Sequence, residues 1–164
     1  MKKLFFLPLL FILLFACKTE QPREVKQYTI EQFYKTVSIF GDSFSPDEKS
    51  LLVTSNKTGI FNVYTLPLAG GEPVAVTQSQ NESMWAISYF PDDERVIYQS
   101  DSGGNEIDHI YVRNTDGKIT DATPWKGAKS SFADWAKDQK SFFFTSNKRD
   151  AQFFDLYEMD IKNM

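Results

Sequence analysis

The sequence has little cysteine, little histidine and no long basic run, and each shortage excludes a class of function. The single cysteine, Cys17, has no second thiol for an internal disulfide. The single histidine, His109, has no second histidine or cysteine with which to hold zinc, and the acidic residues lack the spacing of an EF-hand loop. Basic residues come at most in pairs, at 2–3 and 148–149, so the basic face that a nucleic-acid partner requires is not expected. We therefore predict no cofactor, no metal site and no nucleic-acid binding.

No uncharged apolar run is long enough to span a bilayer. The N-terminal run, residues 4–16, would extend about 20 Å as a helix, short of the roughly 30 Å hydrocarbon core. It follows two lysines, which is typical of a secretory signal peptide. The run ends in Leu14-Phe15-Ala16-Cys17, which resembles the lipobox of bacterial lipoproteins, with Phe15 where a small residue is usual. A secretory peptide without lipidation, in which the cysteine is incidental, is the alternative.

The lipobox resemblance implies a division of the N-terminal region. Residues 1–16 would be a lipoprotein signal peptide, cleaved before Cys17, and residues 17–27 a lipidated cysteine followed by a polar tether. Acyl chains on Cys17 would anchor the exported protein to a bacterial membrane, because two or three chains hold stably where one does not. The expected location is the cell envelope, at the outer membrane or the periplasmic face. The folded part is then residues 28–164.

An internal repeat organises the rest of the chain. Residues 43–55, 88–100 and 134–146 align, and their turn aspartates (Asp47, Asp92, Asp138) are spaced 45 and 46 residues apart. The serines that end each segment keep the same spacing. Each unit has four short segments rich in aromatic and β-branched residues, separated by turns. A period of about 45 residues with four strands per unit is typical of a β-propeller blade.

The predicted fold class is therefore all-β, a partial β-propeller of about three four-stranded blades. The blades are expected at about residues 37–78, 84–124 and 131–164, the last incomplete. Polar loops are expected after each second strand, including one over residues 147–152. One short helical turn should precede the first blade, because Thr29 stands three residues before Gln32, the spacing of a capping box.

The repeats resemble a known family. Phe44-Ser45-Pro46-Asp47, Asn62-Val63-Tyr64 and Asp155-Leu156-Tyr157 are similar to the serine-proline-aspartate propeller repeats in the N-terminal domains of prolyl oligopeptidase-family serine peptidases. The propeller protein of the Tol system has the same type of repeat. The third repeat has Lys137 before Asp138 where proline is usual, so we expect a looser turn there.

The resemblance implies a binding role for this chain. In that family the catalytic triad lies in a C-terminal hydrolase domain, and this chain has no Gly-x-Ser-x-Gly nucleophile elbow. The expectation is a substrate-gating propeller portion of a membrane-anchored peptidase, on an N-terminal fragment whose partner is the missing hydrolase domain or a peptide. The alternatives are a gene that ends at Met164 and a non-enzymatic envelope propeller that acts as a protein-binding scaffold.

A catalytic alternative comes from residues 40–43, Phe-Gly-Asp-Ser, which resemble the nucleophile block of GDSL-type esterases. Such an enzyme needs a histidine base with an aspartate three residues ahead, and His109 has Glu106 at that offset and Asp108 adjacent. Ser43 is also explained by the repeat, where it aligns with Ser88. We therefore expect no catalytic residue in this chain.

A candidate partner-facing rim follows from the blade topology. In an up-and-down blade, the loops after the second and fourth strands leave at one end. Charged and aromatic residues are expected to meet there: Asn105, Glu106, Trp125, Lys148, Arg149 and Asp150. The three tryptophans lie near the starts of blades, where we expect them to pack between neighbouring blades.

Overall fold

The structure is a computed structural model that describes residues 23–162 and 164, so the predicted signal peptide and Cys17 lie outside the described residues. It divides into two units, one ending at Thr36 and one from Val37 to Met164. Within the described part of the first unit, helix α2 (Ile30–Tyr34) confirms the predicted helical turn. Thr29 Oγ1 accepts a hydrogen bond from the Gln32 amide at 3.3 Å, and Gln32 Oε1 accepts one from the Thr29 amide at 2.9 Å. None of the helices in the described residues is long and apolar enough to cross a membrane.

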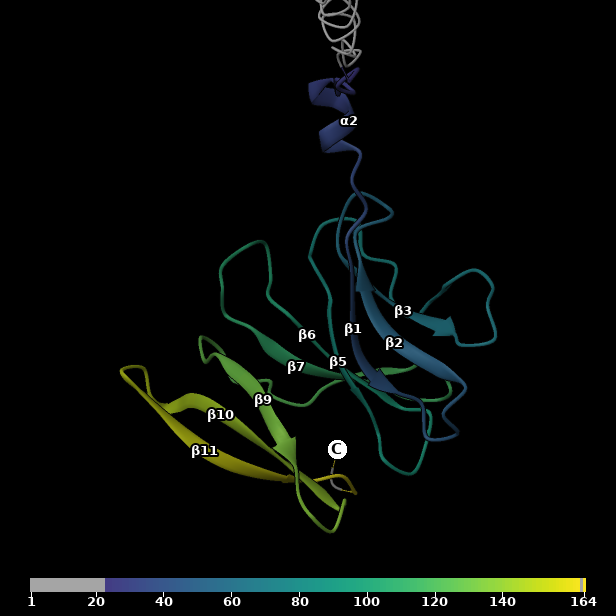
Figure 1. Ribbon diagram of the computed structural model, residues 1–164. Coiled ribbons are helices and arrows are strands. Elements are labelled where there is room, and N and C mark those ends of the chain that lie inside the picture. The colour runs from purple at the N-terminus through teal and green to yellow at the C-terminus, as the bar shows by residue number, and fades with distance from the viewer. Residues whose placement is uncertain (1–22, 163) are drawn as a thin grey trace, which may run out of the picture. The chain divides into compact units, whose positions relative to one another are not determined.

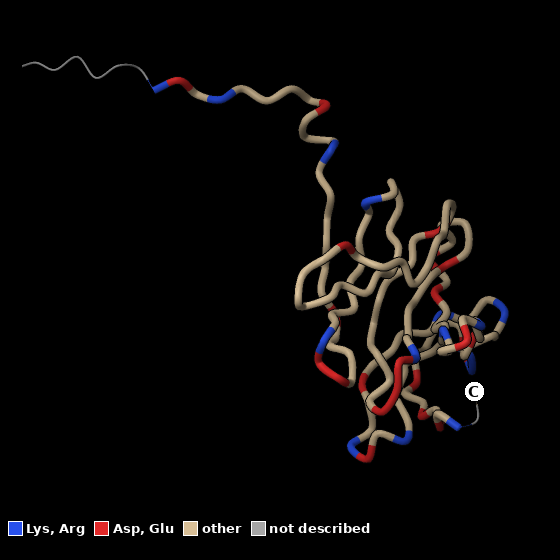
Figure 2. Tube along the Cα trace, turned by 90° about the vertical axis from the view of Figure 1, so that its right-hand side faces the viewer, with Lys and Arg blue, Asp and Glu red and all other residues tan. Residues whose placement is uncertain are grey.

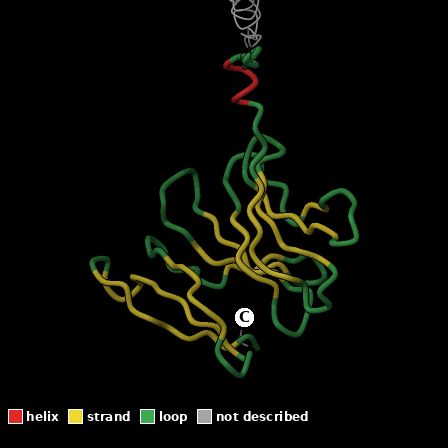
Figure 3. The backbone as a smooth tube through the Cα atoms, viewed as in Figure 1, coloured by secondary structure: helices red, strands yellow, loops and turns green. Residues whose placement is uncertain are grey.

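The second unit consists of three antiparallel sheets that follow one another along the chain (Figures 1 and 3). The first has the order β1-β2-β3-β4, the second β5-β6-β7-β8 and the third β11-β10-β9. This arrangement confirms the all-β, partial-propeller prediction. The strands are β1 (Ile39–Phe44), β2 (Ser50–Ser55), β3 (Asn62–Pro67), β4 (Val74–Ala75), β5 (Trp85–Tyr89), β6 (Val96–Ser100), β7 (His109–Arg113), β8 (Ile119–Asp121), β9 (Ser130–Trp135), β10 (Ser141–Asp150) and β11 (Phe153–Asp160).

The third blade differs from the sequence-based expectation in one segment. Its first strand begins at Ser130, one residue before the expected blade boundary. The polar loop predicted over residues 147–152 is wrong, because β10 continues to Asp150 and turns directly into β11 at Phe153. The polar residues that suggested a loop extend a long hairpin instead.

An aspartate side chain closes the turn between the first and second strands of each blade. Asp47 Oδ1 accepts the Lys49 amide at 3.1 Å, and Asp138 Oδ1 accepts the Lys140 amide at the same distance. The aspartate thus makes the same backbone contact in the third turn without proline. The first turn has two further bonds, because Ser45 Oγ donates to Asp47 Oδ1 at 2.7 Å and accepts the Ser50 amide at 3.0 Å. In the second blade the accepting residue is Asp93 rather than Asp92, and it receives the Arg95 amide at 2.9 Å.

Each blade has a β-bulge in its first strand. The register between first and second strands skips Asp42 in the first blade, Ile87 in the second and Ala133 in the third. These residues are 45 and 46 positions apart, so the bulge is part of the repeat. A bulge bends the strand and increases its twist. In this fold the bulge lies at the same repeat position in the first strand of every blade.

Apolar side chains form one core between each pair of neighbouring blades. Buried residues between the first and second blades are Leu52, Val63, Ala86, Tyr89, Val96 and Tyr98. Those between the second and third include Phe90, Ile97, Ile110, Val112, Phe142 and Phe144, with Trp125 and Trp135 packed against them. The inter-blade packing of these two tryptophans is thus confirmed. Strand β6 serves both interfaces, because successive side chains of a strand point to opposite faces: Val96 and Tyr98 belong to the first core and Ile97 to the second.

Hydrogen bonds between neighbouring blades repeat with the blade period. The Tyr89 amide donates to Ser43 Oγ at 2.8 Å, and Trp135 Nε1 donates to Ser88 Oγ at 3.0 Å. The donor residues follow the two aligned serines by 46 and 47 positions. The aligned serine in the first strand of the first and of the second blade thus holds the next blade in place.

Candidate functional site

The candidate site is the end of the blades where the connections after second and fourth strands emerge. Strands that pair in chain order as antiparallel neighbours place these connections at one end. Charged residues of both signs are interspersed in the turns along the described trace (Figure 2). The connections at this end are residues 56–61, 76–84, 101–108, 122–129 and the turn of the β10–β11 hairpin.

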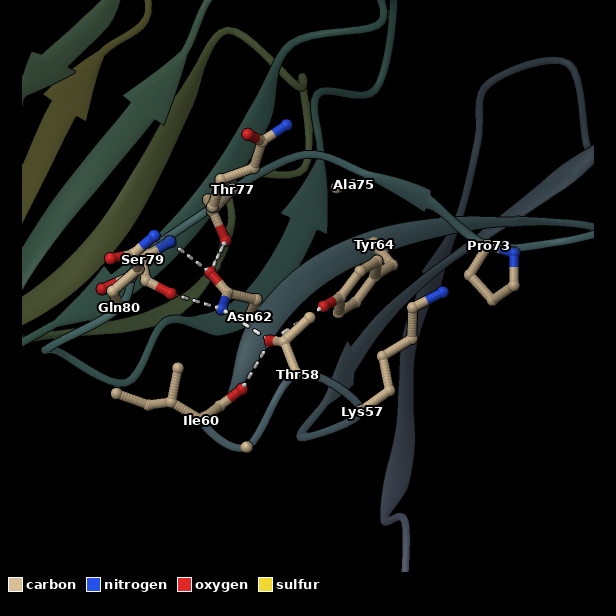
Figure 4. Close-up of a pocket in the computed structure, with 12 residues that line it drawn as sticks. Lys57, Thr58, Ile60, Asn62, Tyr64, Pro73, Ala75, Thr77, Ser79 and Gln80 are labelled. Carbon is tan, nitrogen blue, oxygen red and sulfur yellow. Dashed lines mark hydrogen bonds between the residues drawn. The ribbon is translucent and has the colours of Figure 1, made fainter.

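A cavity with a volume of about 750 Å³ opens at this end of the first blade. Its walls come from the β2–β3 loop, the start of β3 and the stretch from Pro73 to Gln80, as Figure 4 shows. Lys57 is the only charged residue among the lining residues, and its Nζ lies 5.1 Å from the centroid of the Tyr64 ring. The cavity thus offers hydroxyl, amide and one cationic group to a ligand.

Asn62 joins the two walls of this cavity (Figure 4). Its Oδ1 accepts hydrogen bonds from Thr77 Oγ1 at 2.9 Å and from the Ser79 amide at 2.8 Å, and its Nδ2 donates to the Ser79 carbonyl at 3.0 Å. The side chain is buried, and these bonds satisfy most of its polar atoms. Asn62 therefore fixes the shape of the cavity. Thr58 belongs to the same network, since its Oγ1 accepts a hydrogen bond from Asn62 Nδ2 at 3.5 Å and donates one to the Ile60 carbonyl at 3.4 Å.

The second blade contributes the predicted rim residues Asn105 and Glu106. Asn105 Oδ1 accepts the Ile107 amide at 2.9 Å, and the Glu106 amide donates to Asp101 Oδ2 at 2.8 Å. Glu106 has a φ of 59°, a left-handed conformation that the tight loop requires. These bonds organise the loop, so the Glu106 carboxylate is presented outward on an ordered support.

Trp125 and the β10–β11 hairpin meet at the boundary between the second and third blades. Lys148 Nζ lies 3.8 Å from the Trp125 ring centroid and 4.0 Å from that of Tyr157. Trp125 also stacks on Phe144, with centroids 5.8 Å apart and planes at 10°. A cation over aromatic faces is attracted by the ring quadrupole. Three rings thus hold the Lys148 ammonium and fix the hairpin to the preceding connection.

The predicted rim residues Arg149 and Asp150 lie at the end of β10. Arg149 forms a bidentate salt bridge with Asp155 of β11, with distances of 2.6 Å from Nε to Oδ2 and 2.9 Å from Nη2 to Oδ1. The Arg149 guanidinium holds the pKa of Asp155 below its usual value. Asp150 Oδ1 accepts the Gln152 amide at 2.9 Å and closes the turn. Both side chains therefore stabilise the hairpin on which they are exposed.

The structure separates the residues of the esterase alternative. Ser43 Oγ accepts the Tyr89 amide, and His109 Nδ1 lies 2.7 Å from Asp121 Oδ2 on the neighbouring strand β8. Asp108, adjacent to His109 in sequence, pairs with Lys129 Nζ at 2.9 Å. No hydrogen bond joins Ser43 to His109 within the described residues. Ser43 thus has a structural partner in the next blade, and His109 has one in its own blade.

Sequence reasoning missed the cavity on the first blade. The polar loop over 56–59 was recognised, but its partner wall 73–80 lies at the far end of the blade in sequence. The signal that points to it is Asn62, a polar residue at the start of a strand that is otherwise apolar and aromatic. Within residues 23–162 and 164, no group of acidic, cysteine and histidine side chains is arranged to hold a metal ion.

Part of the chain matches a known protein family. Residues 75–161, slightly more than half of the chain, match the N-terminal β-propeller domain of prolyl oligopeptidase. A curated relative, dipeptidyl aminopeptidase BIII from Pseudoxanthomonas mexicana, is 33% identical over 122 residues, which cover 71% of this chain and 17% of that protein. The chain thus spans less than a fifth of the length of this relative.

Solved structures with the same arrangement are propellers. TolB from Acinetobacter baumannii superposes with a TM-score of 0.61 at 22% identity, over 77% of this chain and 30% of that one. A putative TolB from Agrobacterium tumefaciens gives 0.58 at 19% identity, over 76% of this chain and 46% of that one. These similarities confirm the blade architecture.

Proposed function

Because the chain belongs to the family of prolyl oligopeptidase N-terminal β-propeller domains, we propose that it is the substrate-gating propeller portion of a membrane-anchored serine peptidase. The observation that carries the proposal is the family match, which runs from β4 through β11 and covers two successive blades. A relative of the chain is a dipeptidyl aminopeptidase, which supports peptides as the substrate class.

The proposed division of labour assigns binding to this chain and hydrolysis to a hydrolase domain. The end of the blades with the 750 Å³ cavity and the ordered hairpin offers the surface toward which such a domain or a peptide would face. The cavity is lined by neutral hydroxyl and amide groups together with apolar residues such as Ile60 and Pro73, a mixture that suits a peptide backbone. The lipobox around Cys17 supports an envelope location with a lipid anchor.

A second candidate function is that of an envelope scaffold without catalytic activity, favoured by the structural likeness to the TolB propellers. An active-site-directed fluorophosphonate probe separates the two. Membranes of the source organism are labelled with the probe, and the protein is precipitated with an antibody against residues 23–162.

A labelled serine hydrolase in the precipitate, in the same polypeptide or a tightly bound one, is the expected result. A precipitate that contains the chain but no labelled hydrolase contradicts the peptidase proposal and favours the scaffold. Heat-denatured membranes serve as the control, because the probe reacts only with an activated nucleophile.

A further inference from the structure

A second groove lies between the first and second blades. Two adjoining cavities, of about 400 and 270 Å³, share Met84 and Tyr98 as lining residues. The β4–β5 connection forms one wall, and the face of the second blade that looks toward the first forms the other. Ile119 of β8 lines the larger cavity, so the groove reaches the outer strand of the blade. It adjoins the 750 Å³ cavity, with which it shares Ala75, Thr77, Gln78 and Ser79 as lining residues, but Lys57 lines only the 750 Å³ cavity.

The floor of the groove is a pair of stacked tyrosines. The Tyr98 and Tyr111 rings are 5.4 Å apart with planes at 17°. Only 3% of Tyr98 is exposed, yet no hydrogen bond joins its hydroxyl to any of the described residues. Among the described residues, every side-chain nitrogen or oxygen atom that is sealed from solvent has a hydrogen-bond partner. Because the Tyr98 hydroxyl has no such partner, it is not sealed and opens into the groove. Burial raises the pKa of Tyr98 to about 12, and the hydroxyl therefore stays protonated.

The two ends of the groove carry opposite charge. Glu82 and Asp101 line the smaller cavity, and Arg113 lines only the larger one. Neither Glu82 nor Asp101 forms an ion pair with a described residue, while Lys129 is held by Asp108. The pKa of Tyr111 is raised first by burial and then by the negative charges of Asp121 and Glu82.

An aromatic face beside carboxylates without cationic partners suits a planar cation. We propose that this groove binds the guanidinium of an arginine side chain on an extended segment of a peptide or protein partner. The guanidinium lies against the partly exposed Tyr111 ring, donates to Glu82 and Asp101, and donates to the Tyr98 hydroxyl as a further acceptor. A lysine ammonium would use the same charges without the planar stacking. The site goes beyond the gating role, because no hydrolase domain is needed to form it.

The test uses the full chain and two capped tripeptides of the same shape. Acetyl-Ala-Arg-Ala-amide carries the cation, and acetyl-Ala-citrulline-Ala-amide replaces it with a neutral urea. NMR spectra of ring-labelled tyrosine are recorded during titration. The arginine peptide is expected to move the Tyr98 and Tyr111 signals and to bind at least about fivefold more tightly than the citrulline peptide.

Variants locate the binding. Glu82→Gln should weaken arginine-peptide binding about threefold to fivefold, and Tyr98→Phe, which retains the stacked ring, about threefold. Asp116→Asn is the matched control, because Asp116 lies in the β7–β8 turn at the opposite end of the blade and should leave binding unchanged. If Glu82→Gln lowers the urea midpoint, Asp101→Asn replaces it.

Two outcomes overturn the proposal. Equal binding of the arginine and citrulline peptides would show that the positive charge does not contribute to recognition. Binding of the arginine peptide that survives both carboxylate substitutions, or that moves other tyrosines instead of Tyr98 and Tyr111, would place the ligand elsewhere.

Discussion

The indole of Trp135 and the hydroxyl of Ser88 join the second and third blades. Trp135 Nε1 donates to Ser88 Oγ at 3.0 Å, and the ring packs edge-on against Phe90 with centroids 5.2 Å apart. The tryptophan thereby combines apolar burial with a satisfied polar tip. The same serine position in the first blade receives a backbone amide, so different donors serve one acceptor.

Replacement of Ser88 by alanine should lower the free energy of unfolding by about 1 kcal/mol, because the indole N–H loses its acceptor between two blades. Urea denaturation monitored by tryptophan fluorescence measures this. Ser102→Ala, in the exposed loop of the same blade, is the control and should change stability by less than about 0.5 kcal/mol. A Ser88→Ala variant as stable as the control would mean that the bond contributes nothing.

Substitution of Lys148 by methionine keeps the length of the side chain but removes the charge above Trp125 and Tyr157. The variant should lose about 1 kcal/mol of stability, while Lys148→Arg should remain close to the wild type. Lys126→Met, one residue after Trp125, is the control for loss of an exposed charge. If Lys148→Met and Lys126→Met have the same urea midpoint, the three rings do not hold the ammonium.

Asp42, the extra residue of the first bulge, should make stability depend on pH. Partial removal of the carboxyl from water raises its pKa to about 6, against the opposing effect of a hydrogen bond from Thr54, whereas the ordinary value is 3.8. Between these two values the folded state binds more protons than the unfolded state, so stability falls as pH rises. Asp42→Asn should lack this component.

The measurement is the urea midpoint of wild type and Asp42→Asn at several pH values from about 4 to 7. The pKa values of Asp47 and Asp93 are lowered by their own hydrogen bonds and basic neighbours. These two residues contribute equally to the pH dependence of stability in both proteins, so their contributions cancel in the difference. Parallel pH profiles for the two proteins would contradict a raised pKa at Asp42.

Ser43→Ala should destabilise the protein by about 1 kcal/mol without removing any hydrolytic activity, because Ser43 Oγ serves as the acceptor of the Tyr89 amide. Release of p-nitrophenol from an ester substrate is compared for wild type and variant, and neither should exceed the background rate. Turnover by the wild type that disappears in Ser43→Ala would restore the esterase alternative.

Cys17→Ser should abolish acylation and release the protein from bacterial membranes, because the proposed lipid acceptor is the thiol. Metabolic labelling with a radioactive fatty acid, followed by fractionation, measures both effects. Ser43→Ala is a control with the lipobox intact and should remain in the membrane fraction. Equal membrane association of Cys17→Ser and wild type would remove the lipid anchor from the proposed function.

The blades could be predicted from sequence because their landmarks recur at a fixed distance. The turn aspartates and the serines at the strand ends keep the same period, and this predicted the three sheets without knowledge of their pairing. The bulges were not predicted, since Asp42, Ile87 and Ala133 share a position but no chemistry. Their common property is a register shift, which only the pairing of strands reveals.

The candidate site was predictable only in part. Topology placed Trp125 and the third-blade hairpin at the same end, but the polar run after Ser146 was interpreted as a loop. That run forms a strand because Lys148 packs on rings and Arg149 pairs with Asp155 across the hairpin. Such tertiary contacts override local propensity. The cavity and the tyrosine groove depend on segments distant in sequence, and no local pattern could reveal them.

The hydrogen bonds that repeat between neighbouring blades also determine how local unfolding propagates through the molecule. Ser43 links only the first blade to the second, and Ser88 links only the second to the third. Within residues 37–162, no hydrogen bond or ion pair joins the first blade to the third. Cooperativity therefore runs along a row from neighbour to neighbour, as in a chain of repeats. A destabilising substitution in the first blade can unfold that blade alone, because the second blade still packs against the third. Partial unfolding therefore starts at one end of the row.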